Sequence, residues 1–315
     1  MPSRFYAYRG KRHRKQGFPA VVIILLLFAA GAGVFAIAGG LNNSSANMRR
    51  QIMESWREGD YDGAFTMSAL GLEKKPMDFF LLTVNGFSAY QIAIAQINSS
   101  DTQRFIDASV WSLRKAMLTK EGKRDERIFY VLGKAYYYKG APFMDLAVSY
   151  LEAASSSGYP ASDINEYLGL AYAALKDYQS SVNAFSKALQ PVNGDAPLSG
   201  SDIFLLAIAR SYFELGETGR AKAYLMRALE VSRDYKTIVS ARILLGNVFV
   251  AENDLAAAEN QYLTILNESG ESAEARFFLG EIYALKENTI RARAEWRKAL
   301  RIDPAYAPAR ERLNI

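Results

Sequence analysis

Residues 278–283 read Phe-Leu-Gly-Glu-Ile-Tyr, and this stretch decides the fold. Apolar residues continue from it at steps of three and four, through Ala292 and Trp296, until Asp303-Pro304 closes the pattern. That spacing predicts two helices, because one face of a helix repeats about every 3.6 residues. A glycine on the first helix lets the second helix approach closely, and the aromatic ring of Tyr283 fills the space beside it. The segment therefore predicts one tightly packed helix pair.

The same unit recurs four times upstream. Its copies begin at Leu132-Gly133, Leu168-Gly169, Ile208-Ala209 and Leu245-Gly246. From Gly133 to Gly280 the small residues are spaced by 36, 40, 37 and 34 residues. Self-similarity at a nearly constant period of this size is typical of repeat proteins. Five units in one register make a strong signal, whereas any one of them alone would be weak.

The pattern Leu-Gly-x-x-Tyr, then Ala-x-x-x-Phe, then a closing proline resembles the tetratricopeptide repeat. The resemblance implies an all-α chain that forms a right-handed α-solenoid of about seven helix pairs. Each pair then covers the apolar face of its neighbour, so stability is collective. In this family the first helices of the pairs line a concave wall, which binds an extended or helical peptide.

The chain divides by pattern into a repeat body and its two ends. Residues 120–304 hold the five clear repeats, and residues 48–119 hold two degenerate ones, an N-terminal capping pair and a repeat expanded between Gln96 and Thr102. Residues 305–315 are expected to form a short polar C-terminal cap, which a repeat array needs in order to remain soluble.

The N-terminal segment predicts a membrane anchor. Residues 1–18 carry six basic residues and no acidic one, and residues 19–39 are uncharged and mostly apolar. The apolar core of this segment, 19 residues long, is long enough to cross a bilayer of about 30 Å as one helix, with the lipid bilayer as its partner. The positive-inside rule then places residues 1–18 in the cytoplasm and the body beyond the cytoplasmic (inner) membrane, in the periplasm of a double-membraned bacterium. Residues 40–47 are expected to be a flexible linker.

A cleaved signal peptide is the alternative, because Ala36-Ile37-Ala38 is a small-x-small site. We favour a retained anchor, since the apolar run exceeds the usual length of a signal peptide. Both interpretations export the body; an anchor in a eukaryotic organelle, with the body in the cytosol, is a third. Ala32, Ala36 and Gly40 form a small-residue stripe that would allow self-association, although small residues are also common in signal-like segments.

Composition argues against an enzyme. The chain has no cysteine, and its one histidine, His13, lies in the basic tail. The body thus lacks the usual side chains of zinc sites and nucleophilic triads, and we expect no catalytic residue, metal or cofactor. Outside residues 1–18 the chain has 32 basic and 33 acidic residues, so its net charge gives no sign of a nucleic-acid partner.

The expected binding residues are those on the first helices that face away from the second helices. They are Tyr130, Lys134, Tyr137, Glu166, Leu170, Arg210, Phe213, Asn247, Phe277 and Glu281. The aromatic members of this set are equally well explained as core between helices. Some family members hold a C-terminal carboxylate with a lysine on this wall, but Ile243 and Phe277 stand at the matching positions, so that ligand is not expected.

The function that follows is a membrane-anchored scaffold for protein–protein interaction. Its partners would be other proteins of a cell-envelope assembly, such as a secretion or flagellar motor structure. The alternative is a peptide-binding receptor or chaperone-like adaptor that uses the concave groove alone. An enzyme with unusual carboxylate chemistry is the third and weakest hypothesis.

Overall fold

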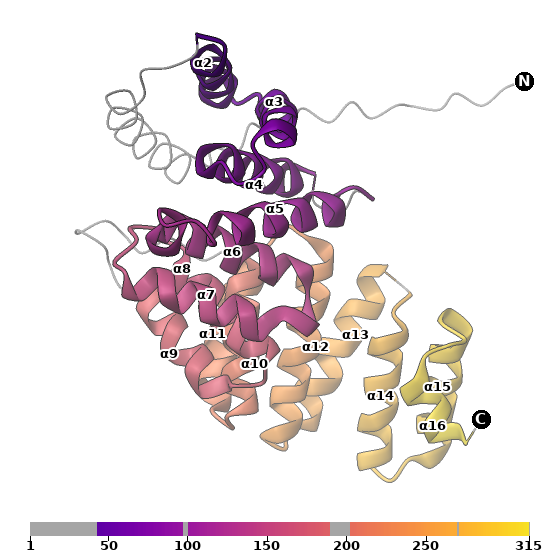
Figure 1. Cartoon of the computed structure of the whole chain (residues 1–315). Helices are drawn as coiled ribbons and strands as arrows, with labels where there is room; N and C mark the ends of the chain where they lie inside the picture. The colour runs from indigo at the N-terminus through magenta and orange to yellow at the C-terminus, as the bar shows by residue number, and fades with distance from the viewer. Residues whose placement is uncertain (1–42, 97–99, 190–201, 270, 315) are drawn as a thin grey trace, which may run out of the picture. The chain divides into compact units, whose positions relative to one another are not determined.

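The computed structural model describes residues 43–96, 100–189, 202–269 and 271–314. Within these ranges the chain is all-α, with fifteen α-helices, two short 3₁₀ turns and no strand, as the sequence predicts (Figure 1). The basic tail, the predicted anchor and the start of the predicted linker lie outside the described residues. None of the helices that the structure describes has the length and apolar character needed to span a bilayer.

The chain forms two compact units. Of the described residues, the first unit contains those from 43 to 119 together with 160–162, and the second contains the others. Helices of the first unit are α2 (Asn43–Glu58), α3 (Tyr61–Lys74), α4 (Phe79–Ala95) and α5 (Thr102–Ala116). Each packs against the next along the chain.

Residues 43–47 differ from the sequence prediction, because they form the first turns of α2 rather than part of a linker. This stretch contains asparagine and serine, which are frequent where helices start, and it contains no proline. Composition alone therefore did not separate a helix start from a linker.

The second unit consists of five helix pairs and a final helix. The pairs are α6 (Glu126–Lys139) with α7 (Met144–Ser156), α8 (Ile164–Ala174) with α9 (Tyr178–Ala188), α10 (Asp202–Glu214) with α11 (Thr218–Val231), α12 (Tyr235–Ala251) with α13 (Leu255–Ser269), and α14 (Ala273–Leu285) with α15 (Thr289–Ile302). The final helix is α16 (Ala307–Leu313), which packs on α15. The first helices α6, α8, α10 and α12 also contact one another in sequence, so they form a continuous layer.

Close approach at the repeat glycines holds each pair together. A Cβ atom at Gly133 would lie 2.6 Å from Leu151 Cγ, and one at Gly246 would lie 2.5 Å from the ring of Tyr262. Gly280 is covered in the same way by Trp296. The predicted role of the small residue is thus confirmed, and any side chain at these positions would push the second helix away.

The turns inside the pairs use a recurrent local device. Lys176, Asn253 and Glu287 end the first helix of their pairs with φ near +60°, in the left-handed region that stops an α-helix. The next residue is Asp or Asn, and its side chain accepts a hydrogen bond from the backbone N–H three residues later. Each turn therefore closes one helix and caps the following one.

Candidate functional site

The predicted wall residues lie on the first helices of the second unit, but their surroundings divide them into three groups. Those on α6, together with Glu166 on α8, belong to a cluster of tyrosines and charged groups. Those farther along, from Leu170 on α8 to Asn247 on α12, are half-buried or exposed. Those on α14 are covered by the C-terminal cap.

The cluster between α6 and α8 centres on Lys134, which is only 8% exposed. Its Nζ lies 2.7 Å from Asp163 Oδ2 and donates to the hydroxyl of Tyr130 at 3.0 Å. Tyr130 in turn donates its hydroxyl proton to Asp163 at 2.8 Å. Lys134 Nζ also lies 4.3 Å from the ring centroid of Tyr167, a cation–π contact. Lys134 and Tyr130 are therefore buried and hydrogen-bonded within the protein, and they form the inner part of the cluster.

Three aromatic rings, those of Tyr137, Tyr138 and Tyr167, form the outer part of this cluster. Tyr137 meets Tyr167 edge-on with ring centroids 5.3 Å apart, and Tyr138 shares a hydrogen bond of 2.9 Å with the hydroxyl of Tyr167. Tyr137 and Tyr138 are half-buried, and burial is the main cause that raises the pKa of both phenols. We call Tyr130, Lys134, Tyr137, Tyr138, Asp163, Glu166 and Tyr167 the tyrosine cluster.

Glu166 is the charged residue of the tyrosine cluster that has no ion-pair partner among the described residues. Burial raises the pKa of its carboxyl, the charge of Asp163 raises it further, and Lys134 lowers it. Lys134 is already paired with Asp163, so its charge does not fully compensate Glu166. Within the described ranges no side chain donates a hydrogen bond to Glu166 or pairs with it directly.

The middle group lies on the C-terminal half of α8 and on α10 and α12. Leu170 of α8 and Phe213 of α10 are half-buried and pack against the apolar core, so each side chain contributes in part to the stability of the fold. Arg210 is exposed, and its charge lowers the pKa of the Glu274 carboxyl, which burial raises. Asn247 accepts a hydrogen bond of 2.8 Å from the hydroxyl of Tyr262 on α13. Asn247 thus joins the two helices of its own pair.

The last group faces the C-terminal cap. Phe277 meets Tyr306 with ring centroids 5.7 Å apart, and both pack on the small core under α16. Glu281 accepts two hydrogen bonds, of 2.9 and 2.6 Å, from the guanidinium of Arg312 on α16. These two residues are therefore engaged by α16.

The sequence pattern did not point to Asp163, Tyr167 or Glu274, and it left open whether Tyr137 or Tyr138 lines the groove. Asp163 immediately precedes α8, and its position next to α6 depends on the approach of two helices. The signal that was available is the tyrosine run at 136–138, of which only Tyr137 was chosen. Helix phase decides such a choice, and Tyr136, which is 2% exposed, belongs to the core.

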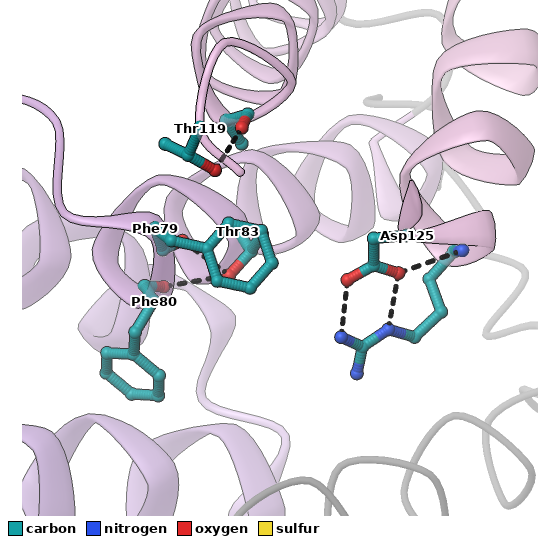
Figure 2. Close-up of polar contacts among 7 residues, drawn as sticks. Phe79, Phe80, Thr83, Thr119 and Asp125 are labelled. Carbon is teal, nitrogen blue, oxygen red and sulfur yellow. Dashed lines mark hydrogen bonds and ion pairs between the residues drawn. The ribbon is translucent and has the colours of Figure 1, made fainter. Parts of the chain in front are cut away.

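Local polar contacts lie near the start of one helix in each unit (Figure 2). In the second unit, Asp125 caps α6 and holds the guanidinium of Arg127 through two hydrogen bonds. In the first unit, the hydroxyl of Thr83 donates to the carbonyls of Phe79 and Phe80 at 2.9 and 3.0 Å. These contacts are structural, since all of them stay within one helix and its cap.

A polar hollow of about 480 Å³ opens among α7, α8 and α9. Its lining includes Glu152, Tyr172 and Lys187. The Tyr172 hydroxyl donates to Glu152, and burial together with this carboxylate raises the pKa of Tyr172 to about 12. No group of three or more His, Cys, Asp or Glu residues within the described ranges is placed to hold a metal ion.

Comparison with family models matches two descriptions, both named tetratricopeptide repeat. One covers residues 130–196 and 243–307, and the other covers residues 204–235. Together they cover slightly more than half of the chain. A search of curated proteins found no match.

Solved structures with the same fold support this match. The crystal structure of PilW, described as a widely conserved type IV pilus biogenesis factor, has a TM-score of 0.56 at 18% identity and covers 72% of this chain and 98% of its own. The C-terminal part of a repeat-containing protein from Cytophaga hutchinsonii has a TM-score of 0.55 at 16% identity, covering 84% and 98%. PilF from Pseudomonas aeruginosa has a TM-score of 0.52 at 15% identity, covering 73% and 96%. At these identities the likeness shows the fold alone.

Proposed function

Because the chain belongs to the tetratricopeptide repeat proteins, which bind other proteins or peptides, we propose that it is a membrane-anchored scaffold for protein–protein interaction. Residues 19–39 would hold it in the cytoplasmic membrane, with residues 1–18 in the cytoplasm and the body on the far side. Its partners would be proteins of a cell-envelope assembly. Secretion, flagellar motor and pilus structures are machines of this class.

The observation that carries the proposal is the surface of the first helices in the second unit. Apart from the positions engaged in the core or by α16, this surface presents half-buried tyrosines and the charged groups Glu166 and Arg210. Half-buried aromatic rings beside isolated charges are typical of surfaces that bind protein. The rings provide apolar surface that is buried on binding, and the charges determine the position at which the partner chain aligns. A surface of this composition is suited to binding a segment of another protein.

Affinity purification from membranes tests the proposal. The full chain, tagged at its C-terminus and extracted in mild detergent from its native cell, should recover a reproducible set of envelope proteins. The test variant is Arg210→Glu, which reverses an exposed charge on the first-helix surface. Recovery of the same set by wild type and variant, or of no envelope protein by wild type, would count against the proposal.

Protease accessibility tests the topology separately. In intact cells with a permeabilised outer membrane, added protease should degrade the body and leave the anchor with the membrane. Degradation only from the cytosolic side would reverse the orientation. A body found entirely in the soluble fraction would favour cleavage after Ala38.

A peptide-binding receptor is the second candidate, favoured by the concentration of tyrosines at one place, between α6 and α8. A receptor would lose all partners when this one surface is altered. A scaffold that also uses its second helices would keep some of them. The same purification with Tyr137→Leu, which alters the tyrosine cluster, therefore separates the two by the fraction of partners lost.

A further inference from the structure

We propose that the tyrosine cluster is a subsite for one cationic side chain, an arginine or lysine, on an extended segment of a partner protein, with Glu166 as its counter-ion. The inference rests on the proposed function, because it names the chemistry of the segment that the first-helix surface binds. It assigns the cluster a role that neither the fold nor the family match defines.

Charge balance is the first argument. Lys134 and Asp163 lie 2.7 Å apart and neutralise each other. Glu166 then leaves the tyrosine cluster with one net negative charge, and no described side chain pairs with it directly. A half-buried carboxylate without a partner is costly, because burial removes water without replacing its hydrogen bonds. A cation from outside would supply the missing partner.

The aromatic rings are the second argument. Lys134 Nζ already lies over the rings of Tyr130 and Tyr167, at 5.0 and 4.3 Å from their centroids. Tyr137 and Tyr138 meet edge-on with centroids 5.5 Å apart and remain half-buried. A guanidinium or ammonium group gains a further attraction from such ring faces, and a planar guanidinium can stack on them. Carboxylate and rings together therefore favour a cation over a neutral polar group.

Other ligand chemistries fit the cluster less well. An anionic group, such as a C-terminal carboxylate, would meet the charges of Glu166 and Asp163, while the one local cation, Lys134, is buried and paired. A purely apolar segment would cover Glu166 and remove more water from it without offering a hydrogen bond. Both outcomes raise the cost of the unpaired charge.

The position of the cluster matches an extended segment rather than a free small cation. Helices α6, α8, α10 and α12 form a continuous layer, and Leu170 and Phe213 follow the tyrosine cluster along it. Both side chains are half-buried, and they offer apolar surface farther along the same layer from the Glu166 carboxylate. A bound segment would thus place its cation on the tyrosine cluster and apolar side chains beyond it.

The test uses a displayed library of random twelve-residue peptides, selected on the full chain in detergent. Peptides that compete with one another are synthesised, and each arginine is replaced by citrulline, which keeps the shape and removes the charge. Binding is measured by fluorescence anisotropy on wild type, Glu166→Gln and Tyr137→Leu. Glu152→Gln is the matched control, because this carboxylate lies on the second helix α7 and is exposed.

We expect selected peptides to be enriched in arginine or lysine at one position. Citrulline at that position and the Glu166→Gln change should each weaken binding about tenfold or more, as loss of a charge-assisted hydrogen bond does, and Glu152→Gln should leave it unchanged. Peptides that bind without a required cation, or that bind Glu166→Gln as well as wild type, would overturn the inference and leave the proposed function standing. A selection that yields no binder to the first-helix surface would contradict both.

Discussion

Helix pairs α4–α5 and α12–α13 reach the same close packing by different chemistry. In both, a glycine on the first helix lies under a large side chain of the second: a Cβ at Gly86 would be 2.5 Å from Leu113 Cγ, and one at Gly246 the same distance from the Tyr262 ring. The α4–α5 pair adds a buried polar network around Asn85, whereas the α12–α13 pair relies on aromatic and aliphatic contacts. The backbone contact is thus the shared element, and the side chains around it are free to change.

This difference explains which part of the chain resembles the family in sequence. The models match residues 243–307 but none of residues 43–119. In α4, buried positions include Thr83, Asn85 and Ser88, which are polar. A motif built on apolar and aromatic residues does not detect them, although the helices still pack in pairs.

The largest effect is expected from breaking the shared contact. In Gly246→Val, the Cβ atom would lie only 2.5 Å from ring carbons of Tyr262, so the second helix must move. We expect the free energy of unfolding to fall by about 3 kcal/mol, the upper range for overpacking, measured by urea denaturation of the full chain. Gly219→Ala is the control, because a Cβ there meets nothing within 4 Å and an alanine suits the helix. Equal stability of Gly246→Val and wild type would contradict the role of close approach.

Removing the polar network should cost less. Asn85 donates to the Phe65 carbonyl and to Ser68, both at 3.1 Å, and accepts from Ser112 at 2.7 Å. Asn85→Leu leaves the buried Ser112 hydroxyl without this acceptor and removes two further hydrogen bonds, although Ser68 still donates to the Phe65 carbonyl at 2.8 Å. We expect a loss of about 2 kcal/mol in the same assay.

The triple variant Asn85→Leu, Ser68→Ala, Ser112→Ala tests the reason for that loss. It removes both serine hydroxyls that bond to Asn85, including the Ser112 hydroxyl that Asn85→Leu leaves without its acceptor, and it should recover more than half of the lost stability. A triple variant less stable than Asn85→Leu alone would show that packing, rather than hydrogen bonding, sets the cost.

A smaller loss of stability is expected when the buried ion pair of Lys134 with Asp163 is broken, and a still smaller one for the more exposed pair of Lys222 with Glu252. Lys134→Met removes a cation that is 8% exposed and leaves Asp163 with Tyr130 as its hydrogen-bond donor. We expect a loss of about 1 to 2 kcal/mol, below the cost of breaking a fully buried pair. Lys222→Met, which breaks the more exposed pair with Glu252, should cost less than about 1 kcal/mol. Thermal unfolding of both variants in parallel compares them, and equal losses would argue against the buried role of Lys134.

The smallest effect is expected at Glu166, and its sign is opposite. The folded-state pKa of Glu166 is raised above its ordinary value, so its charge destabilises the folded state above that pKa and ceases to do so as pH falls through it. Glu166→Gln should therefore raise the melting temperature slightly at neutral pH, and the gain should vanish in acid. Asp163 and Lys134 also face this carboxyl, so the comparison is made at constant salt. A variant less stable than wild type at neutral pH would contradict the assigned electrostatics.

Sequence predicted the fold well because its determinants are local. The spacing of small and aromatic residues identifies the helix pairs, and contacts such as Gly133 with Leu151 confirm it. The surface was harder, because it depends on how neighbouring helices meet. Asn247 and Glu281 were expected on the wall, but the structure shows them bonded to Tyr262 and Arg312. Asp163, which precedes α8, became part of the tyrosine cluster only through the approach of α6.

Site-specific photo-crosslinking in the native cell tests the central claim, that the first-helix surface of the second unit binds partner proteins. A photoreactive phenylalanine analogue replaces Tyr137 on α6 in one variant and Met226 on α11, which is 62% exposed, in the other. The account predicts a defined protein crosslinked at position 137 and a much weaker one, or none, at position 226. Crosslinks confined to position 226 would contradict it.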